Sequence, residues 1–108
     1  MAEHRNEPRN LGYAKVILNN FPAYLRNLTF DGCKIVSIES LPCNSGDTAV
    51  LQIIPEENTG IKSIDISAEL RWSREEAPYY TYGFKLIGFN SPEDETNYNK
   101  LVAIYDRQ

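Results

Sequence analysis

Two arginines near the start of the chain are spaced to hold an anion. Arg5 and Arg9 stand four residues apart in Arg5-Asn6-Glu7-Pro8-Arg9. Pro8 disfavours helical geometry at the residue before it, so we expect an extended arm in which the two Cα atoms lie up to roughly 13 Å apart. Guanidinium groups pair with phosphate oxygens and with guanine O6 and N7. The pair fits a compact phosphate-containing ligand, although most arginines in polar tails serve only solvation.

A second polar group occurs in Asn27-Leu28-Thr29-Phe30-Asp31-Gly32, at the expected end of a strand. Asn27 both donates and accepts hydrogen bonds, Thr29 offers a hydroxyl, and Gly32 permits a positive φ or the close approach of a ligand to the backbone. The same segment also fits an ordinary hairpin, because Asp31-Gly32 is a turn signal that needs no ligand. It is therefore either a binding surface or a plain strand-to-turn junction.

A β-rich frame is expected to position both groups. Strict alternation over residues 64–73 predicts a half-buried strand with Trp72 on the same face as Ile64, Ile66, Ala68 and Leu70. Residues 79–89, rich in aromatic and β-branched side chains, predict a partner strand after a five-residue loop at 74–78. Four shorter strands are expected at residues 13–18, 23–29, 33–38 and 48–54. About six short strands at this spacing predict a small barrel or sandwich.

The last segment changes from strand to helix periodicity. Ser91 is suited to cap a helix, and Pro92 fits the first helical position. Apolar positions at Tyr98, Leu101, Val102 and Tyr105 then form one stripe that would pack on the barrel. The expected organisation is a flexible arm over residues 1–12 and one β-barrel domain with a C-terminal helix over residues 13–108.

Charge narrows the range of partners. The net charge of -4 argues against holding duplex DNA or RNA, or an anionic membrane, by bulk electrostatics. The distribution is uneven, since four cations and two acids give +2 over residues 1–30 and the remaining residues 31–108 carry -6. Seven tyrosines on a β-rich frame raise a further hypothesis, a barrel that binds single-stranded nucleic acid, but -6 would repel such a polyanion.

Several other classes are disfavoured by composition. Nucleophilic catalysis needs a positioned base, and the only histidine, His4, lies in the arm, so we expect no enzyme. Cys33 and Cys43 lack the spacing of a zinc or redox site and are expected to be inert thiols, with no metal or cofactor. No apolar run is long enough for a membrane helix or a secretory signal, so we expect a cytoplasmic protein without membrane insertion.

The order of these features resembles the PilZ domain family, whose pattern is RxxxR in an N-terminal arm followed by [D/N]xSxxG at the first strand junctions. Here the first element is Arg5-Asn6-Glu7-Pro8-Arg9 and the second is Asn27-Leu28-Thr29-Phe30-Asp31-Gly32. The late strand pair and the closing helix from Pro92 are also similar to the family. The resemblance implies a six-stranded antiparallel β-barrel with one C-terminal helix.

The family resemblance also implies a ligand, the bacterial second messenger cyclic di-GMP, bound on the outside of the barrel. By resemblance, Arg5 and Arg9 would hold phosphates and guanine edges, while Asn27, Thr29 and Gly32 would line the surface that receives a guanine. Two positions depart from the family pattern: Thr29 replaces the motif serine but keeps its hydroxyl, and His4 stands where many members have a further arginine.

The leading prediction is a single-domain receptor for cyclic di-GMP that relays the signal to a partner protein. The alternative is a PilZ-shaped interaction module that does not bind nucleotide. Both arginines and the motif glycine Gly32 are present, which favours the receptor. The identity of the partner, the process it serves and the ligand stoichiometry stay open at this level.

Overall fold

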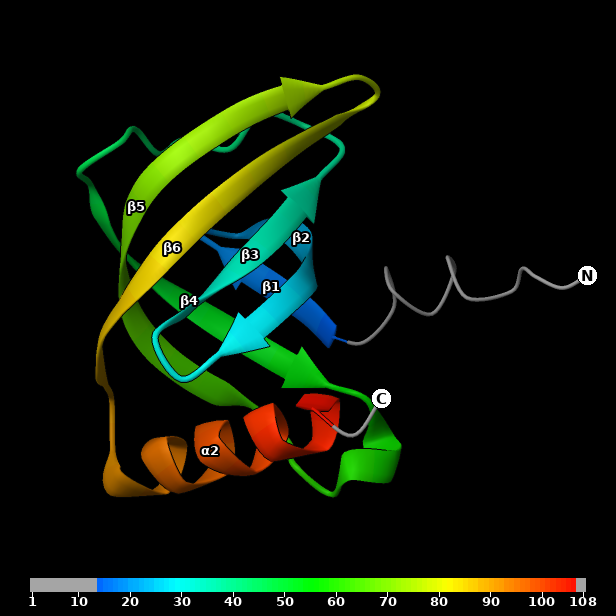
Figure 1. Cartoon of the computed structure of the whole chain (residues 1–108), viewed down its shortest axis with the longest axis vertical. Helices are drawn as coiled ribbons and strands as arrows, with labels where there is room; N and C mark the ends of the chain where they lie inside the picture. Colours follow the sequence, from blue (N-terminus) through cyan, green and yellow to red (C-terminus); the bar gives the residue numbers. More distant parts are fainter. Residues whose placement is uncertain (1–13, 107–108) are drawn as a thin grey trace, which may run out of the picture.

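The computed structural model describes residues 14–106, which form six strands and a closing helix (Figure 1). Every neighbouring pair is antiparallel, and the strands close in the order β1-β2-β3-β6-β5-β4. The predicted barrel with one C-terminal helix is confirmed. The elements are β1 (Ala14–Leu18), β2 (Phe21–Thr29), β3 (Gly32–Ser37), β4 (Thr48–Pro55), the 3-10 turn η1 (Glu57–Thr59), β5 (Ile64–Glu76), β6 (Tyr79–Phe89) and α2 (Pro92–Asp106).

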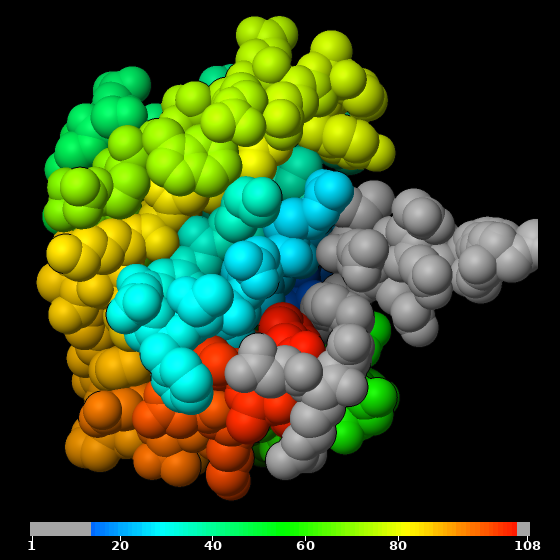
Figure 2. All heavy atoms as spheres, in the orientation of Figure 1, coloured from blue at the N-terminus to red at the C-terminus, as the bar shows by residue number. Residues whose placement is uncertain are grey.

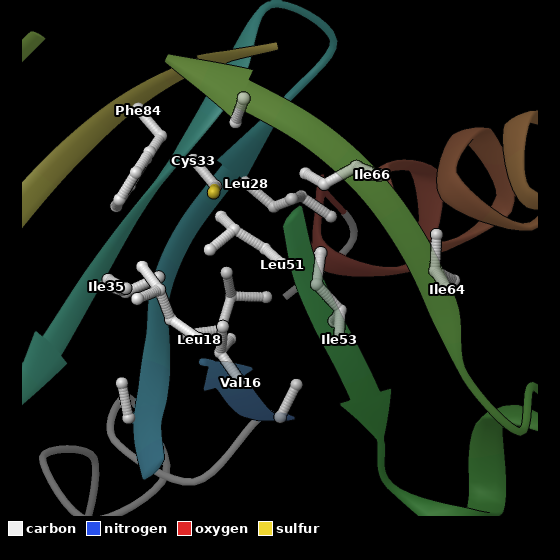
Figure 3. Packing of buried hydrophobic residues seen from close by; sticks show 14 of the residues in the cluster. Val16, Leu18, Leu28, Cys33, Ile35, Leu51, Ile53, Ile64, Ile66 and Phe84 are labelled. Carbon is white, nitrogen blue, oxygen red and sulfur yellow. The ribbon is translucent and has the colours of Figure 1, made fainter. Parts of the chain in front are cut away.

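Alternating side chains of all six strands fill the inside of the barrel. Val16, Leu25, Ile35, Ile53 and Leu70 are completely buried there. Figure 3 shows aliphatic side chains from several strands converging on this interior. Each fully buried side chain of this size contributes about 1.5–3 kcal/mol of transfer free energy, so the barrel interior is the main source of stability.

The helix α2 closes one end of the barrel (Figure 1). Tyr98, Leu101 and Val102 are buried, as the apolar stripe predicts. At the helix start the Asp94 N–H donates to the Ser91 hydroxyl over 3.2 Å, and that hydroxyl donates to the Asp94 carboxylate over 2.9 Å. The other carboxylate oxygen of Asp94 accepts the N–H of Asp65 in β5 at 3.1 Å. The cap therefore also ties the helix to the sheet. No helix within residues 14–106 has the length and apolar character required to cross a membrane.

The connection between β5 and β6 differs from the expected five-residue loop. Arg74, Glu75 and Glu76 continue β5 and pair with Thr81, Tyr80 and Tyr79. The turn is only Ala77-Pro78, which carries a cis peptide bond. Residues 71–76 are all exposed, so this half of the strand needs no apolar face. Polar composition was therefore a poor marker for the end of the strand.

Gly32 also differs from its expected role as a turn residue. The two-residue turn is Phe30-Asp31, and Gly32 is already the first residue of β3. Among the described glycines only Gly46 and Gly60 have positive φ, so Gly32 is not selected for that conformation. A Cβ atom at Gly32 would instead collide with the backbone carbonyl oxygen of Phe84 in β6. The glycine is required by the close approach of two strands.

This contact predicts different outcomes at two glycines of the sheet. Gly32→Ala should lower the free energy of unfolding by about 1–3 kcal/mol, since the new methyl group meets backbone that has to move. Gly88→Ala is the matched control, because a Cβ atom there has no neighbour within 4 Å, and its effect should stay within about 0.5 kcal/mol. Urea denaturation measures both, and equal losses in the two variants would contradict the strand-contact explanation.

Candidate functional site

Asn27, Thr29 and Gly32, the second predicted motif, lie together at the hairpin between β2 and β3. Thr29 pairs with Gly32 directly before the turn, and Asn27 pairs with Lys34. The Thr29 hydroxyl accepts the N–H of Asp31 at 3.2 Å and donates to the carbonyl of Gly32 at 3.3 Å. We call residues 29–32 the motif turn. The Thr29 hydroxyl is the only hydroxyl in the motif turn, and we call its two hydrogen bonds within the turn the brace. Thr29 therefore has a structural role independent of any ligand.

A bulge in β2 turns the motif side chains outward. The register of β2 against β3 shifts between Leu25 and Asn27, so one extra residue is accommodated at this point. As a result the inward positions run Ala23, Leu25 and then Leu28 rather than Asn27. Asn27 and Thr29 are both exposed on the outer surface. The bulge thus keeps the amide out of the apolar core and presents it to solvent.

A second bulge turns the Trp72 side chain outward. It lies in β5, where the register against β6 shifts between Leu70 and Trp72. The expectation that Trp72 shares the inner face with Leu70 is therefore wrong, since Leu70 is fully buried and Trp72 is 37% exposed. The indole covers Gly83 of β6, where an added Cβ atom would strike the ring. The guanidinium of Arg74 lies 5.1 Å from the centroid of the Trp72 ring, within cation–π range.

These two outward-facing regions border one open hollow of about 550 Å³, which we call the motif hollow. It is lined by Asn27 and the motif turn on one side and by Arg71 and Trp72 on the other. Gly83 and Lys85 of β6 lie between them in the sheet. Figure 2 shows this face, with the cyan residues of the β2–β3 region and the lime residues of β5 on either side of yellow residues of β6.

The motif hollow is basic although the chain is acidic. Lys34, Arg71 and Lys85 line it against one carboxylate, Asp31, so three positive charges less one negative give +2. Sequence reasoning missed these three cations and misplaced Trp72. The available signal was Gly83, because a glycine inside an aromatic strand often marks the close approach of another group.

The predicted arginines Arg5 and Arg9 lie outside the described residues. The first described residue, Ala14, begins β1, and the next residue, Lys15, pairs with Tyr24 of β2. Because the two strands are antiparallel, β1 starts beside the part of β2 that leads to Asn27. Arg9 precedes Ala14 by five residues, and five residues of extended chain span at most roughly 17 Å between Cα atoms.

The described part of the chain has two free thiols, and one of them lines the motif hollow. This residue, Cys33, is buried, and burial raises the pKa of its thiol to about 12, so it stays protonated near neutral pH. Cys43 lies outside the hollow, is half-buried and is also a free thiol. Within residues 14–106, no group of three or more His, Cys, Asp or Glu side chains is placed to hold a metal ion. What the hollow does offer is an amide, cations and an indole.

Comparison with known structures supports the same fold. The Bacillus subtilis inhibitor of motility MotI/DgrA aligns with a TM-score of 0.70 and 16% identity, covering 90% of this chain and 48% of that one. The Borreliella burgdorferi PlzA protein, solved in complex with c-di-GMP, aligns with a TM-score of 0.51 and 14% identity, covering 99% of this chain and 49% of that one. The chain thus spans about half the length of each. No protein-family model and no curated protein matches the sequence. The barrel has a PilZ-like fold.

The brace within the motif turn predicts a difference between two substitutions at Thr29. Thr29→Val keeps the shape but removes the acceptor for the Asp31 N–H, so the free energy of unfolding should fall by about 1 kcal/mol. Thr29→Ser keeps the hydroxyl and should lose less than half of that. Chemical denaturation measures both, and a valine variant as stable as the wild type would show that the brace is unimportant.

The two thiols should also differ in reactivity. Iodoacetamide at pH 8 should modify Cys43 in the native protein and leave Cys33 unmodified, because Cys33 is buried and its pKa is raised to about 12. Intact-mass spectrometry should therefore find one adduct, and none in Cys43→Ser. An adduct on the Cys43→Ser variant under native conditions would contradict the packing around Cys33.

Proposed function

We propose that the chain is a receptor for cyclic di-GMP and that it binds this ligand in the motif hollow. The observation that carries the proposal is the convergence on one outer face of the motif residues Asn27, Thr29 and Gly32 with Trp72 and a local charge of +2. The PilZ-like fold and the structure of PlzA with c-di-GMP support it.

The side chains match the chemistry of this ligand. Cyclic di-GMP has two phosphates, each with one negative charge, which balance the local charge of +2. The indole of Trp72 offers an aromatic surface for a guanine, and such stacking is worth about 1–3 kcal/mol per base. The exposed amide of Asn27 complements the donors and acceptors of the guanine edge. Arg71 and the two lysines pair with phosphate oxygens.

The arm completes the site in this proposal. Arg5 and Arg9 are proposed to hold the phosphates and guanine edges of the ligand. Ordering of the arm then creates a surface that a protein partner recognises, which is how the receptor relays its signal. We further propose that the protein is bacterial, works in the cytoplasm and is not an enzyme. The acidic barrel outside the hollow disfavours DNA and RNA.

Isothermal titration calorimetry with cyclic di-GMP tests the proposal. The wild type should bind, Arg9→Ala should lose detectable binding, and Trp72→Ala should weaken the affinity roughly 5- to 150-fold. Lys100→Ala is the matched control, because Lys100 is an exposed cation on α2 that does not line the hollow, and its loss should leave the affinity unchanged.

Two further results bear on the assignment. A random single-stranded oligonucleotide at low salt should give no heat with the wild type, and strong binding would favour a nucleic-acid barrel instead. A folded wild type that shows neither heat nor a thermal shift with cyclic di-GMP would reject the receptor and leave the interaction module.

A further inference from the structure

A tyrosine of the closing helix lies directly beneath the motif turn. Tyr98 is completely buried, and its hydroxyl oxygen is 2.7 Å from the carbonyl oxygen of Thr29 and 3.2 Å from that of Gly32. These carbonyls belong to the two residues that pair across the hairpin where the turn begins. The contacts span 69 and 66 residues of sequence. A single phenol hydrogen is thus shared by both ends of the motif turn.

The Tyr98 side chain packs against β6 and against its neighbours in α2. The Tyr98 ring packs edge-to-face on Phe89 at 5.5 Å between centroids. Leu101 and Val102, on the next turn of α2, are buried beside it. Burial raises the pKa of Tyr98 above its ordinary value, so the phenol stays a donor. The Tyr98 hydroxyl therefore holds the motif turn from the core side, and its location depends on how α2 packs against the barrel.

The other contacts of the motif turn come from the turn itself and from β6, and none of them reaches the helix. The Thr29 hydroxyl accepts the N–H of Asp31 at 3.2 Å and donates to the carbonyl of Gly32 at 3.3 Å, which is long for a hydroxyl donor. On the β6 side the N–H of Leu86 donates to the carbonyl of Asp31 at 2.8 Å. Without the Tyr98 hydroxyl, the carbonyls of Thr29 and Gly32 would lose their shared link to the helix.

We propose that Tyr98 is a positioning residue that holds the motif turn in the geometry the ligand requires and thereby couples the site to α2. The proposal rests on the proposed binding of cyclic di-GMP in the motif hollow. Coupling is reciprocal, so a ligand that favours the fixed turn also strengthens the docking of α2. The closing helix then responds to occupancy of a hollow that none of its own residues lines.

The test compares two buried tyrosines. Tyr98→Phe removes the hydroxyl beneath the motif turn. Tyr82→Phe is the matched control, because the Tyr82 hydroxyl accepts the N–H of Leu41 at 2.8 Å and does not line the motif hollow. Both variants should lower Tm by a similar few degrees. In calorimetry Tyr98→Phe should weaken cyclic di-GMP binding roughly 5- to 10-fold, the equivalent of one hydrogen bond, whereas Tyr82→Phe should change it less than 2-fold.

Amide hydrogen exchange on the ligand-free protein supplies a readout that does not depend on binding. In Tyr98→Phe the N–H groups of Asp31 and Leu86 should exchange roughly tenfold faster than in the wild type, and in Tyr82→Phe they should not. Unchanged exchange in Tyr98→Phe overturns the positioning role. The role is also overturned if the Tyr98→Phe variant binds cyclic di-GMP as tightly as the wild type does. If the wild type itself does not bind cyclic di-GMP, the proposed function fails while the exchange rates still decide whether Tyr98 positions the turn.

Discussion

The arrangement of this protein depends on the rule that each strand residue of a closed barrel faces either the core or the solvent. A side chain on the wrong face would put an amide among apolar groups, at a cost of several kcal/mol, or leave a core position empty. The bulges at Leu25/Asn27 and at Leu70/Trp72 shift the phase of β2 and β5 by one residue. Leu28 stays inside while Asn27, Thr29 and Trp72 are turned to the same outer surface. The candidate site exists because the alternation is interrupted at these two places.

Two glycines make the outer surface compatible with these shifts. At Gly32 the backbone of β3 comes close enough to Phe84 to exclude a Cβ atom, and at Gly83 the missing side chain leaves space for the Trp72 ring. Both glycines therefore have structural roles before any ligand is considered. Gly32, the glycine of the sequence pattern, allows the close approach of β3 to β6 and also lines the hollow.

The net charge of the chain conceals a local cluster of positive charge that the fold brings together. Residues 31–108 sum to -6, yet three cations from β3, β5 and β6 meet in one hollow with a single carboxylate. These strands are neighbours in the closed order, so residues as distant in sequence as Lys34 and Lys85 border the same surface. An acidic protein can in this way carry a small basic surface.

Local patterns in the sequence determined the six strands, the helix and the alternating core from Ile64 to Leu70. Period-2 and period-3.6 hydrophobic spacing and the helix cap at Ser91 act over only a few neighbouring residues. Local patterns also marked Asn27, Thr29 and Gly32 as a group. Only the tertiary structure decided that Trp72 faces outward, that Gly32 serves a strand contact and that Tyr98 lies beneath the motif turn. The reason is physical: a bulge arises from pairing with another strand, and a contact across 69 residues has no local signature.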